Sequence, residues 1–239
     1  MTDFLGDIDE IRALELAAVL PLLPGSGRLL EIGAGSGRQA LELSRLGFTV
    51  DAIDIASSDY SERRVFPVRD YDGTTLPFAD GSFDLIFSSN VLEHVRDLDG
   101  LQAEIRRVLK PSGECLHVVP THAWRFWTSA AAVPGLVKGL ARSRKAGDAM
   151  AAIRRCGSGL VRRHGERGNV VTELHYFRPA WWRRTFRRNG FELVAERPIG
   201  LFYTAERLFS RRLSWQRRRA LARIFGSATH AFRLRKRES

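Results

Sequence analysis

The chain has 239 residues, of which 44% are hydrophobic and 27% charged, as expected for one globular α/β domain with an insertion and not for a disordered chain. No apolar run reaches the roughly 18 to 20 residues of a membrane-spanning helix, and the acidic start MTDFLGDIDE does not resemble a signal peptide. We therefore expect a cytoplasmic protein. Cys115 and Cys156 match no metal-ligand pattern, so no metal is expected, and Cys115 is expected to be buried.

Charge is divided unevenly between the two halves of the chain. Residues 1–119 carry 11 Lys and Arg against 20 Asp and Glu, whereas residues 120–239 carry 27 against 7. This division predicts that the second half faces an anionic partner such as lipid headgroups, a phosphorylated carrier or nucleic acid. A competing explanation is a genome rich in G and C, because 34 of the 38 basic residues are arginine.

The first half alternates strands and helices. Such alternation is typical of a mostly parallel sheet whose right-handed crossovers place helices on both faces. The elements expected in chain order are a helix over 7–20, a strand over Arg28–Ile32, a helix over Arg38–Leu46, strands over Phe48–Ile55, Val65–Arg69 and Ser82–Ser89, a helix over Asp97–Leu109 and a strand over Glu114–Val119.

After Pro120 the alternation breaks and later resumes. Residues 121–175 are expected to be an insertion that covers the substrate, within a domain spanning residues 1–204. The rhythm returns with a helix over Pro179–Arg188 and a strand over Phe191–Glu196, and residues 205–239 are expected to form a basic helical extension.

A glycine-rich loop directly follows the first expected strand. Its sequence is Glu-Ile-Gly-Ala-Gly-Ser-Gly over residues 31–37, and such glycines allow a sharp turn and close approach of a ligand. Arg38 stands where a dinucleotide fingerprint needs its third glycine, and a P-loop lysine is absent. Asp54, at the end of the next strand, can accept hydrogen bonds from the hydroxyls of an adenosine ribose.

Several further motifs follow in order: Asp72-Gly73 with Leu76-Pro77-Phe78, Phe83-Asp84, Asn90-Val91-Leu92-Glu93-His94, and Leu109-Lys110-Pro111 with Gly113. Together with the glycine loop and Asp54 they resemble class I S-adenosylmethionine (SAM)-dependent methyltransferases, most closely the small-molecule "type 11" group. The resemblance covers residues 26–120 and, more loosely, 176–197. It implies a Rossmann-like fold with a seven-stranded mixed sheet and helices on both faces.

The resemblance also implies roles for individual residues. The glycine loop passes under the methionine and ribose of SAM, Asp54 takes the ribose hydroxyls and Ile55 packs on the adenine. Asp72 binds the adenine amino group, with Asp70 as its rival. The implied cofactor-binding residues are Glu31, Gly33, Ala34, Gly35, Gly37, Asp54, Ile55, Tyr71, Asp72, Gly73 and Asn90.

Methyl transfer to a hydroxyl needs a base beside the acceptor. His122 follows the fifth expected strand and His94 the fourth, so both are candidates, although packing and capping explain His94 equally well. His117 lies within a strand and is expected in the core. His164 and His175 flank a polar part of the insertion, where a substrate-facing lid or a solvated loop is favoured over a metal site.

These features predict an enzyme that O-methylates a small metabolite, a glycan or a lipid-linked intermediate. The first alternative is an RNA methyltransferase, although no RNA-binding module is recognisable, so nucleic acid is less favoured as a partner. The second is a non-catalytic SAM-binding scaffold with a basic interaction tail. The basic C-terminus also suggests peripheral contact with the anionic inner face of the membrane.

Overall fold

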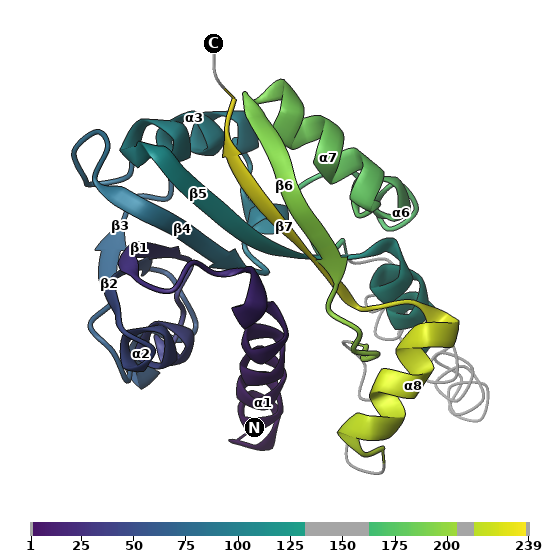
Figure 1. The fold of residues 1–239 in the computed structure, drawn as a ribbon. Coiled ribbons are helices and arrows are strands. Elements are labelled where there is room, and N and C mark those ends of the chain that lie inside the picture. Colours follow the sequence, from purple (N-terminus) through teal and green to yellow (C-terminus); the bar gives the residue numbers. More distant parts are fainter. Residues whose placement is uncertain (1, 132–162, 205–212, 238–239) are drawn as a thin grey trace, which may run out of the picture. The chain divides into compact units, whose positions relative to one another are not determined.

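A computed structural model describes residues 2–131, 163–204 and 213–237 (Figure 1). The chain divides into two compact units. Unit 1 comprises Met1–Val119, Arg183–Ile199 and Ala231–Ser239, and unit 2 comprises Pro120–Trp182 and Gly200–His230. None of the described helices combines the length and apolar character needed to cross a bilayer.

Seven strands form one sheet in the order β3-β2-β1-β4-β5-β7-β6. The pairs from β3 through β5 are parallel, whereas β7 runs opposite to β5 and β6 in Figure 1. The expected seven-stranded mixed sheet is therefore confirmed. The strands are β1 Gly27–Ile32, β2 Phe48–Ile55, β3 Arg69–Tyr71, β4 Phe83–Ser89, β5 Leu109–Pro120, β6 Phe191–Pro198 and β7 Thr229–Lys236.

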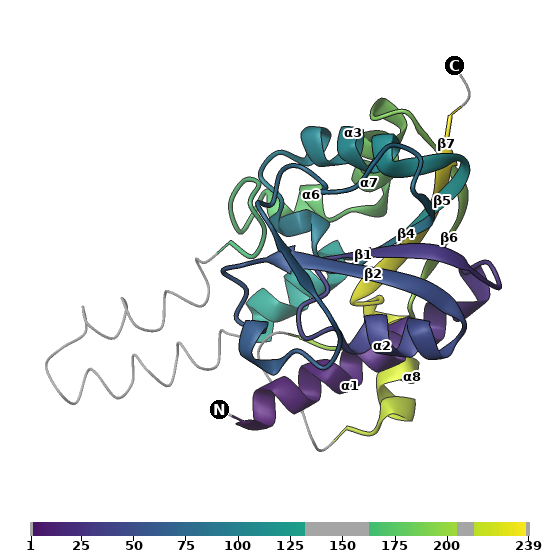
Figure 2. The same cartoon turned by 90° about the vertical axis from the view of Figure 1, so that its left-hand side faces the viewer.

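Helices cover both faces of this sheet, with α1 and α2 on one face and α3 and α7 on the other (Figure 2). The start of α3 is set by Asp97, whose carboxylate accepts the backbone N–H of Gly100 at 2.9 Å. The helices are α1 Thr2–Val19, α2 Arg38–Arg45, α3 Leu98–Val108, α6 Glu173–Tyr176, α7 Pro179–Arg188 and α8 Trp215–Phe225, with 3₁₀ turns at Leu20–Leu22, Ser61–Arg63 and Leu92–His94.

The core lies around the central strands β1 and β4, which are almost continuously apolar. Leu29, Leu30, Ile86 and Phe87 are fully buried, as expected for parallel strands covered on both faces. Cys115 on β5 is also buried, and burial raises the pKa of its thiol, so its expected packing role is confirmed. The strand order reverses between β1 and β4, and ligands bind at such switch points in open α/β sheets.

Two strand boundaries differ from the sequence-based expectation. The third strand is β3 at Arg69–Tyr71 and not Val65–Arg69. The N–H of Val65 instead bonds the carbonyl of Ser36 at 2.8 Å, and Pro67 has no N–H for a ladder. The fifth strand begins at Leu109 and not at Glu114, because Leu109 pairs with Phe83 and the register of β5 against β4 shifts over residues 110–113.

The expectation of an all-helical C-terminal extension is wrong. Residues 215–225 form the basic helix α8, but Thr229–Lys236 form β7, inserted between β5 and β6. Buried Phe232 and Leu234 alternate with Arg233 and Arg235 along β7, which is the period of a strand. Residues 132–162 of the expected insertion and residues 205–212 of the expected extension lie outside the described residues.

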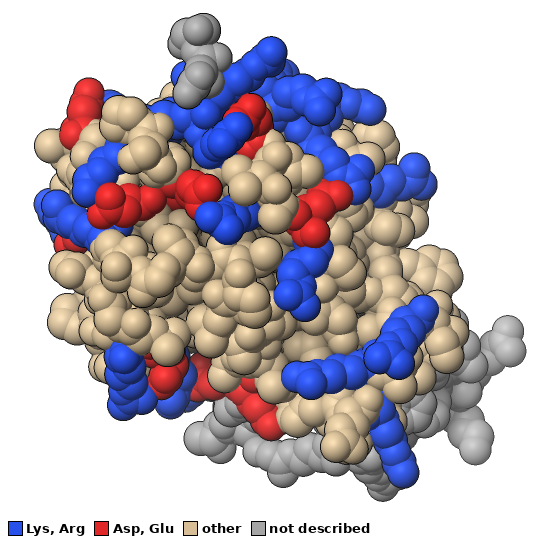
Figure 3. Space-filling view, in the orientation of Figure 1, with Lys and Arg blue, Asp and Glu red and all other residues tan. Residues whose placement is uncertain are grey.

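Part of the charge division is neutralised inside unit 1, where basic residues from the second half pair with acidic residues from the first. Arg188 pairs with Asp99 at 2.8 Å, and Arg233 pairs with Glu114 at 2.7 Å. Figure 3 shows blue and red side chains intermingled over this part of the surface. In this unit some of the surplus arginines are therefore neutralised by ion pairs at the surface.

Candidate cofactor site

The site begins where the carboxyl ends of β1, β2 and β4 come together in unit 1. The backbone N–H groups of Gly33 and Ala34 both donate to the carbonyl of Ile53 on β2, at 2.9 and 3.0 Å. The N–H of Asn90 donates to the carbonyl of Val118 on β5 at 2.8 Å. These bonds fix the glycine loop and the end of β4 against neighbouring strands, so the predicted loop residues lie at the switch point.

The three loop glycines are required for different reasons. All have positive φ, at +72° for Gly33, +56° for Gly35 and +76° for Gly37, a region that other residues enter only with strain. A Cβ on Gly33 would lie 2.3 Å from Val91, and one on Gly37 would lie 2.8 Å from Phe66. Only Gly35 has an ordinary neighbour, the ring of Tyr60 at 3.5 Å. The protein's own packing therefore accounts for the first and third glycines.

Asp54 joins β2 to this loop. Its Oδ2 accepts the N–H of Gly35 at 3.0 Å, its Oδ1 accepts the N–H of Ile55 at 2.8 Å, and the residue is only 9% exposed. Both oxygens retain a second lone pair for a ligand. The predicted juxtaposition of the glycine loop and Asp54 is therefore present.

Glu31 is a second carboxylate at the same place. It is 2% exposed, and its Oε2 has no hydrogen-bond partner within the described chain. Burial raises the pKa of Glu31 to about 8; the N–H of Ala40 opposes this rise, whereas the nearby charge of Asp54 adds to it. A buried acid with an unused oxygen is costly, and a cationic or hydrogen-donating ligand group would relieve that cost.

The adenine side of the predicted site is also assembled. Ile55 is 42% exposed although it is large and apolar, and a Cβ on Gly73 would lie 3.3 Å from it. Ile55 pairs with Tyr71 across β2 and β3. Burial, together with the charges of Asp54 and then Asp72, raises the pKa of Tyr71 to about 12. An exposed apolar platform bordered by polar groups suits a heteroaromatic ring.

The structure distinguishes the two aspartates proposed for the adenine amino group. Asp70 lies on β3, where Arg64 binds its Oδ1 at 2.5 Å. Asp72 is exposed, and its Oδ1 accepts the N–H groups of Thr74 and Thr75 at 2.8 Å, which lowers its pKa. The Asp72 carboxylate is therefore ionised and held by its own turn, whereas Asp70 is engaged by arginine.

Asn90 occupies a strained position at the end of β4. Its φ of +56° places it alone among the described non-glycine residues in the left-handed region. Its Nδ2 donates to Glu15 Oε2 at 3.2 Å and to Ser89 Oγ at 3.2 Å. Such strain persists only where the surroundings impose it, and it concentrates at ligand sites.

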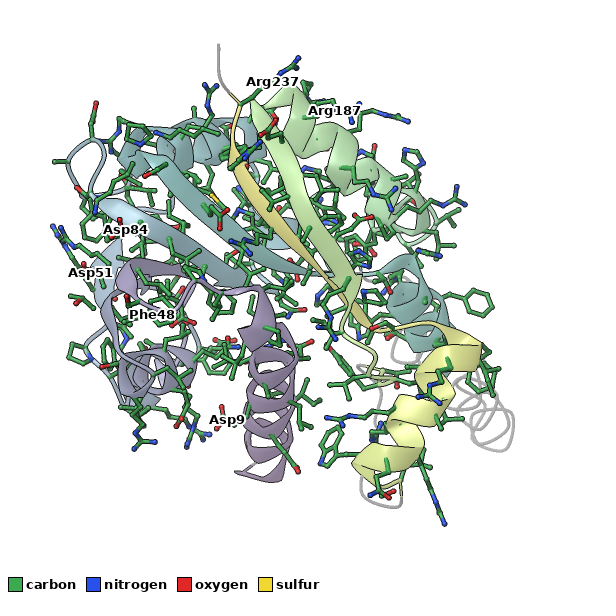
Figure 4. All side chains as sticks on the ribbon, in the orientation of Figure 1. Asp9, Phe48, Asp51, Asp84, Arg187 and Arg237 are labelled. Atoms are coloured by element: carbon green, nitrogen blue, oxygen red, sulfur yellow. The ribbon has the colours of Figure 1, made fainter. Side chains whose placement is uncertain are left out.

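Glu15 of α1 is a site residue that sequence reasoning missed. It is completely buried and pairs with Arg12 at 2.5 Å. The neighbouring Asp9, seen on the α2-facing side of α1 in Figure 4, pairs with Arg38 at 2.7 Å. The sequence signal for Glu15 was an acid on the apolar side of the expected helix, beside Leu16 and Val19. Tyr60, which packs on Gly35, had no sequence signal.

The two candidate bases fall in different units. His94 ends the 3₁₀ turn after Val91 in unit 1, and its Nε2 lies 3.7 Å from Oε1 of buried Glu93. His122 belongs to unit 2, where its N–H donates to the carbonyl of Phe177 at 3.1 Å. Burial and then the charge of Arg178 lower the pKa of His122. His117 is fully buried, as expected, and bonds Ser88 at 2.8 Å.

The described end of the insertion is organised by a buried ion pair. Nε of Arg125 lies 2.8 Å from Oε2 of Glu173, with side-chain exposures of 4% and 0%. Oε1 of Glu173 accepts the N–H groups of His164 and Gly165, at 2.6 and 2.8 Å. Glu173 therefore holds residues 164 and 165 against Arg125, and both of its oxygens are occupied by these contacts.

The strand order, the switch-point loop and the paired acids define a class I SAM-dependent methyltransferase fold. Residues 30–117 match the model of the family described as "Methyltransferase domain". The resemblance seen in the sequence motifs is thereby confirmed.

Individual relatives agree with this assignment. The chain is 38% identical over 104 residues to the biotin biosynthesis bifunctional protein BioHC of Cellvibrio japonicus, covering 41% of this chain and 21% of that protein. It is 30% identical over 115 residues to a ubiquinone biosynthesis O-methyltransferase of Bartonella bacilliformis, covering 44% and 46%. The matched part thus spans less than half the length of these relatives.

A solved structure extends the similarity of fold to most of the chain. An S-adenosylmethionine-dependent methyltransferase from Mesorhizobium loti superposes with a TM-score of 0.57 at 16% identity, covering 93% of this chain and 100% of that one. SAM is the cofactor that this fold and family imply. The residues present fit a cation of this kind, because Glu31 offers an unused oxygen and Asp54 a carboxylate at one loop.

Proposed function

We propose that the protein is a SAM-dependent methyltransferase that methylates an oxygen of a small metabolite, a glycan or a lipid-linked intermediate. The observation that carries this proposal is the pair of acids, Glu31 and Asp54, at one glycine loop beside the exposed Ile55. Two carboxylates match a cofactor that bears an amino group and a sulfonium, and an exposed isoleucine matches its adenine.

Bound SAM supplies an electrophilic methyl group, so the chain's task is to hold and orient the reactants. Asp54 accepts hydrogen bonds from the ribose hydroxyls while it also fixes the loop through Gly35. Asp72 faces the adenine amino group, and Asn90 marks the end of β4 beside the methyl donor. Correct alignment can lower the barrier by about 7 kcal/mol or more.

A hydroxyl acceptor must lose its proton, and His122 is the favoured base. Because its pKa is lowered, its imidazole is neutral near pH 7 and free to accept a proton. His94 is the second candidate, since it follows directly on the Asn90–Val91 segment of the cofactor site. We expect His122→Ala to lower kcat at least tenfold and to leave the Kd for SAM unchanged. If His94→Ala shows this pattern and His122→Ala keeps full activity, the base is His94.

The choice of oxygen as acceptor is supported by the similarity to a ubiquinone biosynthesis O-methyltransferase. The basic second half of the chain supports an anionic or lipid-linked acceptor. We further propose that the protein is cytoplasmic and meets the anionic inner face of the membrane peripherally when the acceptor is lipid-linked.

The test is incubation of the full chain with isotopically labelled SAM and an extract divided into lipid, small-molecule and RNA fractions. We expect label in the lipid or small-molecule fraction, and none with Asp54→Asn, which presents an amide in place of the ribose-binding carboxylate. Label confined to RNA supports the alternative of an RNA methyltransferase. SAM binding by calorimetry without any labelled product supports a non-catalytic scaffold.

A further inference from the structure

A group of exposed apolar side chains lies on unit 2. Ile224 is 76% exposed, Phe126 51% and Phe225 37%. The rings form a continuous series, with Phe126 and Trp127 at 5.0 Å and Trp127 and Phe225 at 4.9 Å between centroids. Solvent-exposed apolar residues normally occur singly, and contiguous groups mark interaction surfaces. The contacting rings therefore indicate a surface that binds a partner.

This group is held rigidly. The indole Nε1 of Trp127 donates to the carbonyl of Phe225 at 3.0 Å, and Phe202 packs on Trp127 and Phe225, with centroids at 6.1 and 5.5 Å. Ser214 caps α8 by accepting the N–H of Arg217. The exposed rings are therefore held in place by hydrogen bonding and ring packing between α8 and the residues around Trp127.

The charge around the group has one sign. The described residues of unit 2 contain eight arginines and two carboxylates, and both carboxylates are already paired, Glu166 with Arg163 and Glu173 with Arg125. Three exposed arginines, Arg217, Arg219 and Arg223, lie on α8 itself, which contains no acid. The apolar group is thus bordered by cations that neither described carboxylate of unit 2 neutralises.

We propose that Phe126, Trp127, Ile224 and Phe225 form a membrane-docking surface that inserts into an anionic phospholipid bilayer, with the α8 arginines contacting the headgroups. Interfacial helices bind membranes by this combination of shallow apolar insertion and basic flanks. Single-stranded RNA would use exposed rings for stacking, but it gives no role to Ile224, the most exposed of the four. The occupant favoured by the chemistry is therefore a lipid surface.

The test is co-sedimentation of the full chain with phosphatidylcholine vesicles containing 30% phosphatidylglycerol and with pure phosphatidylcholine vesicles. We expect binding to the anionic vesicles only, weakened by salt. Changing Arg217, Arg219 and Arg223 together to Gln lowers the partition coefficient about a hundredfold, and Ile224→Ser lowers it about tenfold. Deletion of the C-terminal residues is unsuitable, because it removes β7 from the sheet.

Matched controls separate this surface from charge in general. As a control, changing Arg184, Arg187 and Arg197 of unit 1 to Gln removes equal charge from another surface. Arg187, labelled in Figure 4, lines a separate cavity of about 570 Å³ in unit 1 together with Arg237. Val171→Ser removes a side chain that is 73% exposed but is outside the ring series. Equal losses from test and control variants, or RNA binding without vesicle binding, overturn the proposal. Methyl transfer is not the readout, so the result is independent of the proposed activity.

Discussion

The two units use acids and bases in opposite ways. In unit 1 the acids Glu31, Asp54 and Glu15 gather around one loop, where they are buried or nearly so. In unit 2 both described acids are paired with arginine, and Arg217, Arg219 and Arg223 of α8 are exposed. Unit 1 thus holds two buried acids at the glycine loop, Glu31 and Asp54, that can face a cationic ligand, whereas both described acids of unit 2 pair with arginine inside that unit. The difference predicts that the two units respond separately to mutation.

The largest expected effect is on unit 2, from Arg125→Met. This change leaves Glu173 buried without its cationic partner and should cost about 3 kcal/mol of unfolding free energy. Urea denaturation measures the loss, and calorimetry should find SAM affinity within about twofold of the parent, because the cofactor residues lie in unit 1. Arg163→Met, which breaks the exposed pair with Glu166, should cost less than about 1 kcal/mol. Equal costs for both variants would contradict an anchoring role.

In unit 1, Gly33→Ala should have the next largest effect. The new methyl group meets Val91 at 2.3 Å and the backbone is left-handed, so we expect a loss of about 2 to 3 kcal/mol. Gly47→Ala is the matched control, because Gly47 also has positive φ, at +97°, but no atom lies within 4 Å of its Cβ position. If thermal denaturation shows the same loss of stability for both variants, the contact with Val91 does not contribute to the cost of the substitution.

Burial of Glu31 makes the stability of unit 1 depend on pH. Its folded pKa of about 8 lies above the ordinary value of 4.5, so the folded state binds the proton more tightly. Its contribution to stability is therefore present below pH 4.5 and is lost as pH rises towards 8, at up to about 1.4 kcal/mol per pH unit. Glu31→Gln should flatten this fall in urea midpoints, whereas the exposed Glu42→Gln should leave it unchanged.

The smallest expected effect separates Asp72 from Asp70. Asp72→Asn should weaken SAM binding about fivefold, since a charged hydrogen-bond acceptor for the adenine amino group is lost. Asp70→Asn should change the Kd less than twofold, because Arg64 engages that carboxylate. Calorimetry with both variants decides the assignment, and the reverse order would identify Asp70 as the adenine partner.

Short-range patterns predicted the fold of residues 27–120 well. The second strand and the helix at Pro179–Arg188 have the expected bounds, because hydrophobic periodicity and glycine punctuation specify such elements locally. The pairing of the glycine loop with Asp54 followed from one topological fact, that parallel strands end at the same edge. The other cofactor residues were implied by the family resemblance. Chemical roles for these residues and for His94 and His122 remain predictions.

Other features could not be read from the sequence because they depend on distant partners. Glu15 reaches Asn90 across 75 positions, and Arg125 finds Glu173 across the insertion. The strand β7 was not predicted, because its alternating arginines give it the same basic composition as the helix α8 that precedes it. Long-range pairing of polar side chains leaves no local periodicity, so only the folded structure reveals it.

The place of β7 in the sheet has a consequence for biosynthesis. Two earlier strands, β5 and β6, are separated by a strand that the ribosome makes after both of them. The parallel part from β3 to β5 can assemble on the emerging chain, but β6 has no neighbour until Lys236 has left the exit tunnel. The nascent chain therefore carries an unpaired strand edge until β7 has been made and has paired with β5 and β6.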